Sequence, residues 1–199
     1  MHRPAVLAAG TVVFVIATGL AGCGSSSGGG TAAKAVDPNR AEVSPAGDIP
    51  DDQAFVTYAP PRGGYSMKVP EGWARTATGP SVTFTDKLNA IRMERHAAKA
   101  PLSVASAKRS ALPALAKSVP GFVAGTVSEV QRAAGPAIRM TYLAQSKPEP
   151  VTGKARTDAV ERYVFFHNGH DVVLTLSGPK GADNVDPWKI VTESLRFTR

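Results

Sequence analysis

Two apolar segments joined by Asn168-Gly169 constrain the fold more than any other feature of this sequence. Asn-Gly between such segments is the strongest short-range signal for a tight β-hairpin, because both residues accept the positive φ that the turn requires. The turn fixes the register, so that Phe166 faces Asp171 and His167 faces His170 across the hairpin.

The two strands of this hairpin, 159–166 and 171–177, are apolar on both sides. One face holds Tyr163, Phe165, Val172, Leu174 and Leu176, and the other holds Val164, Phe166 and Val173. Strands of this kind are covered on both faces, which places them in the middle of a domain.

The rest of residues 55–199 combines strand and helix patterns and predicts one α+β domain. Residues 103–118 have helical spacing, with Ser103 as the expected N-cap and Pro113 as the point where the helix kinks or divides. A last helix begins at Asp186-Pro187, and its apolar stripe is Trp188, Val191 and Leu195. Further strands are predicted over 65–70, 82–84, 90–94, 126–132 and 137–146.

The first 23 residues have the pattern of a bacterial lipoprotein signal. A basic start is followed by the apolar run 5–20, which is shorter than the ~20 residues that a spanning helix needs. Small residues then precede Cys23, the one cysteine of the chain. We therefore expect residues 1–22 to be a signal peptide and Cys23 to carry diacylglycerol and further acyl chains, which would hold the mature chain on the outer face of the cytoplasmic membrane.

Residues 23–54 predict a flexible tether, because they are rich in Gly, Ser and Ala and almost lack large apolar side chains. Residues 24–53 carry 2 basic and 5 acidic side chains, a net charge of −3, whereas residues 54–199 carry 20 and 11, a net charge of +9. The basic domain fits attraction to anionic lipids or wall polymers, and it fits solubility alone equally.

The order of motifs in the domain resembles that of the PsbP-like fold family. Its opening is Tyr65-Ser-Met-Lys-Val-Pro-Glu-Gly-Trp73, followed by Val82-Thr-Phe-Thr-Asp86, a helix, two long hairpins and a closing helix that ends in Ser194-Leu-Arg-Phe197. Actinobacterial lipoproteins of the LpqN type are similar. The resemblance implies a central antiparallel sheet with helices on both faces, an α/β/α sandwich whose first strand is fastened to the sheet by Tyr65, Pro70 and Trp73. It also implies an accessory or binding role without catalysis.

Two histidines face each other at the hairpin tip. His167 and His170 have Cβ atoms about 5 Å apart in the predicted register, which would allow both to bind zinc or copper. The nearest third ligand is Asp171, on the opposite face, whereas catalytic zinc takes three protein ligands. The alternatives are a metal-binding lipoprotein and a solvated turn.

Basic residues near the strand 90–94 form a candidate site for an anion or a partner. Arg92, Glu94 and His96 alternate on one face, and Lys108 and Arg109 lie on the following helix. If the two faces meet, these residues form an anion-binding patch. Arg95 is a further candidate for binding an anion or a partner. If the faces do not meet, Arg92 and Glu94 are a surface ion pair.

Other chemistry has little support in the sequence. Neither a Walker loop nor Gly-x-Gly-x-x-Gly is present, no metal or organic cofactor is predicted, and nucleic-acid binding is not expected of an exported chain without aromatic residues among the basic ones. We expect a monomeric, non-enzymatic envelope lipoprotein that docks on a membrane or cell-wall partner or holds an apolar ligand. The alternative is an envelope hydrolase that combines a serine with His167 or His170 and Asp171.

Overall fold

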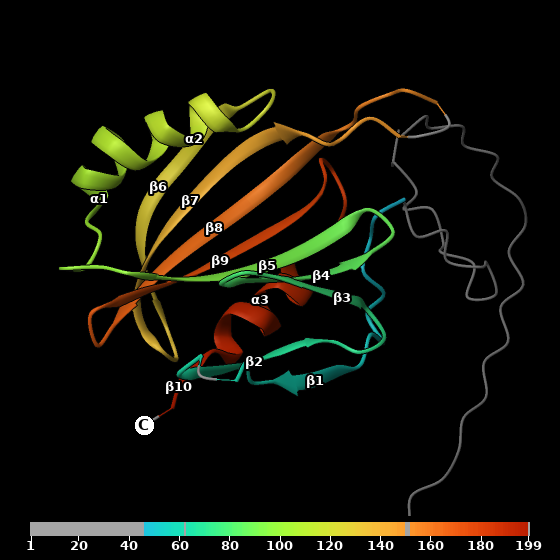
Figure 1. The fold of residues 1–199 in the computed structure, drawn as a ribbon. Helices are drawn as coiled ribbons and strands as arrows, with labels where there is room; N and C mark the ends of the chain where they lie inside the picture. Colours follow the sequence, from blue (N-terminus) through green and yellow to red (C-terminus); the bar gives the residue numbers. More distant parts are fainter. Residues whose placement is uncertain (1–45, 62, 150–151, 199) are drawn as a thin grey trace, which may run out of the picture. The chain divides into compact units, whose positions relative to one another are not determined.

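The computed structural model describes residues 46–61, 63–149 and 152–198 (Figure 1). The predicted signal peptide, Cys23 and most of the predicted tether lie outside these residues. In the described part no helix is long and apolar enough to cross a bilayer.

Seven strands form an antiparallel sheet in the order β3-β4-β5-β9-β8-β7-β6. Its strands are β3 (Ala74–Thr78), β4 (Ser81–Asp86), β5 (Asn89–Ala97), β6 (Val123–Arg132), β7 (Gly135–Gln145), β8 (Thr157–His167) and β9 (His170–Pro179). The central hairpin has the predicted register, with Phe166 opposite Asp171 and His167 opposite His170. Asn168 and Gly169 have φ of 46° and 73°, which confirms the predicted turn.

One face of the sheet is covered by a helical segment (Figure 1). It consists of α1 (Val104–Ser106), the π-helical turn η1 (Ala107–Ala111) and α2 (Leu112–Ser118). Ser103 caps the segment as predicted, with its hydroxyl accepting from the Ser106 backbone N–H at 3.1 Å. The Leu112 N–H bonds to the Ala107 carbonyl five residues back, so a widened turn directly precedes Pro113 and divides the helix there.

The other face is covered by α3 (Val185–Ser194) and by a small sheet of β1 (Phe55–Tyr58), β2 (Tyr65–Pro70) and β10 (Arg196–Phe197) (Figure 1). The main core lies between the central sheet and this layer. The strand 65–70 is not joined to the central sheet by backbone hydrogen bonds, because β2 pairs with β1 and β10 instead. Tyr65 and Trp73 nevertheless pack in the core against the main sheet.

The chain joins the domain before the predicted boundary at residue 55. Ile49 is buried in the main core, and its N–H donates to Asn184 Oδ1 at 2.8 Å. The Gly47 carbonyl accepts from Asn89 Nδ2 at 2.8 Å and from Asn184 Nδ2 at 3.1 Å. These bonds tie residues 47–49, which the sequence predicts as part of the tether, to the domain.

Candidate functional site

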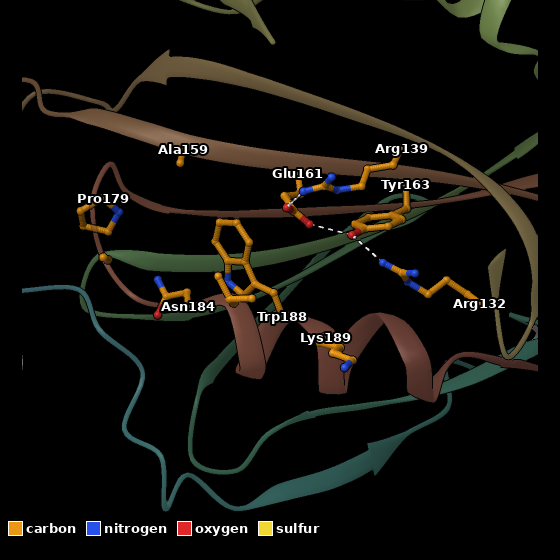
Figure 2. A pocket seen from close by; sticks show the side chains of 11 residues that line it. Arg132, Arg139, Ala159, Glu161, Tyr163, Pro179, Asn184, Trp188 and Lys189 are labelled. Atoms are coloured by element: carbon orange, nitrogen blue, oxygen red, sulfur yellow. Dashed lines mark hydrogen bonds and ion pairs between the residues drawn. The ribbon is translucent and has the colours of Figure 1, made fainter. Parts of the chain in front are cut away.

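A cavity of about 430 Å³ lies between the sheet and α3 (Figure 2). This size is in the range of small-molecule sites in proteins. We call it the α3 cavity. Its walls are formed by Arg132, Arg139, Ala159, Glu161, Tyr163, Pro179, Ala182, Asn184, Val185, Trp188 and Lys189.

The strand pairing explains why polar side chains meet on this wall. Arg139 of β7 lies directly opposite Tyr163 of β8, and Glu161 is two residues from Tyr163 on the same face of β8. Arg132 ends β6, the strand next to β7. The bulk of the core lies further along β8, where Phe165 is fully buried.

Four of these side chains form a continuous chain of contacts (Figure 2). Arg139 donates to Glu161 Oε1 in an ion pair. The Tyr163 hydroxyl donates to Glu161 Oε2 at 2.6 Å and accepts from Arg132 Nη2 at 3.2 Å. The Arg132 guanidinium also lies 5.3 Å from the centre of the Tyr163 ring. These contacts hold both guanidinium groups in place along the cavity wall.

Three buried N–H groups of the wall have no acceptor among the described residues. They are Arg132 Nε, Arg139 Nε and Trp188 Nε1. A buried donor without a partner costs about 1–3 kcal/mol, so few are kept without a reason. All three N–H groups belong to side chains that line the α3 cavity, and all three are hydrogen-bond donors.

The charge of the wall is positive. Arg132, Arg139 and Lys189 line the cavity with Glu161, an excess of two positive charges. Glu193, which is not a lining residue, pairs with Arg132 Nη1 at 3.5 Å and reduces this excess to one. The hydrogen bond that Arg139 donates to Glu161 raises the pKa of Arg139, although burial opposes it. Burial first, and then Glu161, raises the pKa of Tyr163. Both groups therefore keep their protons at neutral pH and remain donors.

The two tip histidines lie on the same side as the main core, directly opposite each other, and each makes a further contact. His167 stacks on Phe197 of β10, and His170 Nδ1 lies 2.9 Å from the carbonyl oxygen of Asn168. Asp171 follows on the opposite face, paired across the strands with His96. The described residues contain no cluster of three or more His, Cys, Asp or Glu suited to a metal ion. The proposed Ser/His/Asp arrangement likewise finds no support around this turn.

The basic residues singled out from the sequence separate into different places. Arg92 donates to Glu94 at 2.9 Å and to the Ser81 hydroxyl at 3.2 Å. Strand alternation puts Arg95 on the opposite face, where it lines a hollow with His170. Lys108 and Arg109 are exposed on η1, and no ion pair of the described residues includes them. Arg92 and Arg95 therefore do not belong to one patch.

Sequence reasoning did not find the α3 cavity. Trp188 belongs to an apolar stripe that predicts core packing, and it is indeed mostly buried. Arg139 stands between Ile138 and Met140, whose side chains are buried on the other face of the sheet. This alternation is a sequence signal that the Arg139 side chain lies on the α3 side of the sheet.

Comparison with known proteins identifies the fold. The sequence matches no family model and no curated protein. The solution structure of cyanobacterial PsbP (CyanoP) from Synechocystis sp. PCC 6803 is similar, with a TM-score of 0.51, 13% identity and coverage of 73% of this chain and 93% of that chain. This likeness shows that the chain has the PsbP-like fold, as its motif order predicts.

Two further structures resemble the chain more weakly. A protein from Bacteroides thetaiotaomicron VPI-5482 has a TM-score of 0.49 and 14% identity over 72% of this chain, which spans about half (48%) of that protein. LpqN, described as involved in cell envelope biogenesis of Mycobacterium tuberculosis, has a TM-score of 0.42 and 17% identity, with coverage of 75% of this chain and 87% of that chain.

Proposed function

We propose that this PsbP-like chain is a lipid-anchored, non-enzymatic binding module on the outer face of the cytoplasmic membrane. Its ligand is a small molecule with an anionic, acceptor-rich group and an apolar body, and it occupies the α3 cavity. The observation that carries the proposal is the set of three buried N–H donors without acceptors on the cavity wall.

An anionic group suits this wall for two reasons. Its oxygens would supply acceptors to Arg132, Arg139 and Trp188 after small rotations of these side chains, which would remove the cost of leaving the donors unpaired. The excess of positive charge favours an anion over a neutral acceptor. Guanidinium groups in particular bind carboxylate, phosphate and sulfonate groups through paired hydrogen bonds.

An apolar body suits the neighbouring surface. A second hollow of about 330 Å³ shares Ala159, Glu161 and Trp188 with the α3 cavity. Its other walls are mainly apolar, among them Val123, Leu143 and Val160. A ligand with its charged group at the arginines therefore has apolar surface next to it.

The state of Glu161 favours binding over catalysis. Both carboxylate oxygens are occupied, one by Arg139 and the other by the Tyr163 hydroxyl. A general base needs a free position toward the proton that it removes. In this role, the lipid on Cys23 supplies the attachment, and the Gly/Ser-rich segment after it gives the module reach above the membrane.

NMR of the chain in nanodiscs of neutral lipid tests the proposal directly. The chain has two tryptophans, so Trp73 gives an internal reference for the indole N–H signal of Trp188. We expect pentanesulfonate to shift the Trp188 signal in a saturable way while the Trp73 signal stays in place. Pentanol, the uncharged control, should not reproduce this shift.

Two variants separate the site from general surface charge. Arg139→Gln should weaken the response of Trp188 to pentanesulfonate by about tenfold, because it removes one charged donor. Arg92→Gln, on the other face of the sheet, should leave the response unchanged. Equal responses to pentanesulfonate and pentanol, or an Arg139→Gln variant that binds as well as the unmodified chain, would contradict the proposal.

A further inference from the structure

Another hollow, of about 460 Å³, lies away from the α3 cavity, where the small sheet meets strands β3, β4, β5 and β9. Its larger polar side chains come from four strands: Tyr58 of β1, Tyr65 of β2, Arg95 of β5 and His170 of β9. It shares no lining residue with the α3 cavity. It is therefore a separate place on the molecule.

The register explains how these side chains meet. His170 is opposite Ala97, and Arg95 is two residues from Ala97 on the same face of β5. Tyr65 is buried in the core layer between the two sheets. Two residues that the sequence suggested for different tasks, Arg95 and His170, thus line one hollow.

Arg95 is a partly buried cation without a counter-ion in the described part of the chain. None of the ion pairs and hydrogen bonds found there uses its guanidinium, and the described residues that line the hollow include neither Asp nor Glu. Other arginines of the domain are paired with carboxylates: Arg92, Arg132, Arg139, Arg156 and Arg162. A partly buried guanidinium without an acid beside it has unused donors and an unbalanced charge.

Two tyrosines line the hollow together with this cation. The pKa of Tyr65 is raised to about 12, first by burial and then by Tyr58, while Arg95 lowers it. Tyr58, Tyr65 and Arg95 all line the same hollow. The hydrogen bonds that tyrosine hydroxyls make within the described residues belong to Tyr163, so the hydroxyls of Tyr58 and Tyr65 have no protein partner there.

We propose that Arg95 and the hydroxyls of Tyr58 and Tyr65 bind the oxyanion of a small organic molecule, a carboxylate or a phosphate monoester. The planar guanidinium donates two parallel hydrogen bonds to such a group, and each phenol donates one more. The hollow is larger than the oxyanion itself. Its remaining wall includes Pro60, Pro80 and Val82, which offer apolar surface to the rest of the ligand.

The test follows the arginine Nε–H signals by NMR, with the chain in nanodiscs of neutral lipid. Phenyl phosphate and benzoate are the two probes, and benzyl alcohol is the uncharged control. We expect the Arg95 signal to shift in a saturable way with at least one of the two anions and not with benzyl alcohol. The anion that binds more tightly identifies the ligand class as phosphate or carboxylate.

Substitutions at Arg95 decide whether the binding has the proposed geometry. Arg95→Lys keeps the charge but loses the planar pair of donors, so it should weaken binding about tenfold, and Arg95→Gln should abolish it. Arg75→Gln is the matched control, since Arg75 lies on the nearby β3 with its guanidinium 5.9 Å from the Tyr58 ring centre. The affinity of the Arg75→Gln variant for the two anions should be unchanged.

Three outcomes would overturn the inference: no saturable shift with either anion, equal shifts with benzyl alcohol, or unchanged affinity in a folded Arg95→Gln variant. The amide spectrum shows whether each variant is folded. Because the two hollows have no residue in common, failure here leaves the α3 cavity proposal standing, and the Arg139→Gln variant should bind phenyl phosphate or benzoate at Arg95 normally.

Discussion

The imidazole ring of His167 lies flat against the phenyl ring of Phe197, with 4.1 Å between the ring centres and 8° between their planes. Phe197 is paired across the strands with Tyr65 of the small sheet. The stack therefore joins the tip of the central hairpin to the small sheet, two parts of the domain that do not share backbone hydrogen bonds.

Replacing His167 should reveal a packing role. His167→Ala removes the ring and should lower the free energy of unfolding in urea by about 1 kcal/mol. His167→Phe keeps a ring at this position and should retain most of the stability of the unmodified chain. His96→Ala, at an exposed position on the other face of the sheet, is the control and should cost less. If zinc stabilised the unmodified chain but not His167→Phe, the histidine would be a metal ligand instead.

Asn184 should be one of the most sensitive positions in the domain. It accepts from the Ile49 N–H and donates to Asn89 Oδ1 at 3.0 Å and to the Gly47 carbonyl. Asn184→Ala leaves buried partners unsatisfied and should cost about 3 kcal/mol of unfolding free energy. Asp183→Ala is the neighbouring control, with an exposed side chain. An Asn184→Ala loss no larger than that of the control would show that residues 47–49 are not held by these bonds.

Gly178 should not tolerate even a methyl group. A Cβ at this position would lie 2.3 Å from Asn89 Oδ1 and 2.8 Å from Asn184 Nδ2, so the buried asparagine pair would have to separate. We expect Gly178→Ala to destabilise the domain by about 2–3 kcal/mol or more in thermal or urea unfolding. Ser177→Ala, one residue earlier on β9, should be much milder. Equal unfolding midpoints for the two variants would contradict the tight packing around the asparagine pair.

Stability should fall as the pH rises from about 10 to about 12. The pKa of Tyr65 is near 10 in an unfolded chain and about 12 in the domain, mainly because of burial. In this window the Tyr65 hydroxyl loses its proton in the unfolded chain but keeps it in the folded chain. The free energy of unfolding therefore falls, by at most about 1.4 kcal/mol per pH unit for one such group. Burial also raises the pKa of Tyr142 and Tyr163, which adds to the slope.

The Tyr65→Phe variant isolates the contribution of Tyr65 to this pH dependence of stability. Its unfolding free energy, measured in urea across this window, should depend less steeply on pH than that of the unmodified chain. An identical pH slope in Tyr65→Phe and the unmodified chain would show that Tyr65 ionises as readily in the folded state as in the unfolded one.

The elements that the sequence predicted correctly are those with local signals. The Asn168-Gly169 turn determines the register of β8 and β9, because a tight turn leaves no freedom to slip. Ser103 caps its helix through a bond three residues away, which is equally local. The stripe of Trp188 and Val191 identifies the core face of α3 from spacing alone.

The parts that the sequence missed depend on contacts between distant segments. β10 is two residues long, too short for any periodic pattern, and it exists because it pairs with β2 more than 100 positions earlier in the chain. Arg132, Arg139 and Trp188 likewise come from three elements, and only the folded sheet brings them to one wall. No spacing rule connects such residues, so the α3 cavity could not be inferred before the fold was known.

In-cell photocrosslinking at the α3 cavity tests the central claim most directly. Photo-lysine in place of Lys189, an exposed residue of the wall, would sample the ligand in the native envelope, and photo-lysine in place of Lys117 on α2 is the control. The account predicts a discrete small-molecule adduct from position 189, absent from position 117, and lost in Arg139→Gln or when Cys23→Ser detaches the chain. The same adducts from both positions, or an adduct at 189 that persists in Arg139→Gln, would contradict it.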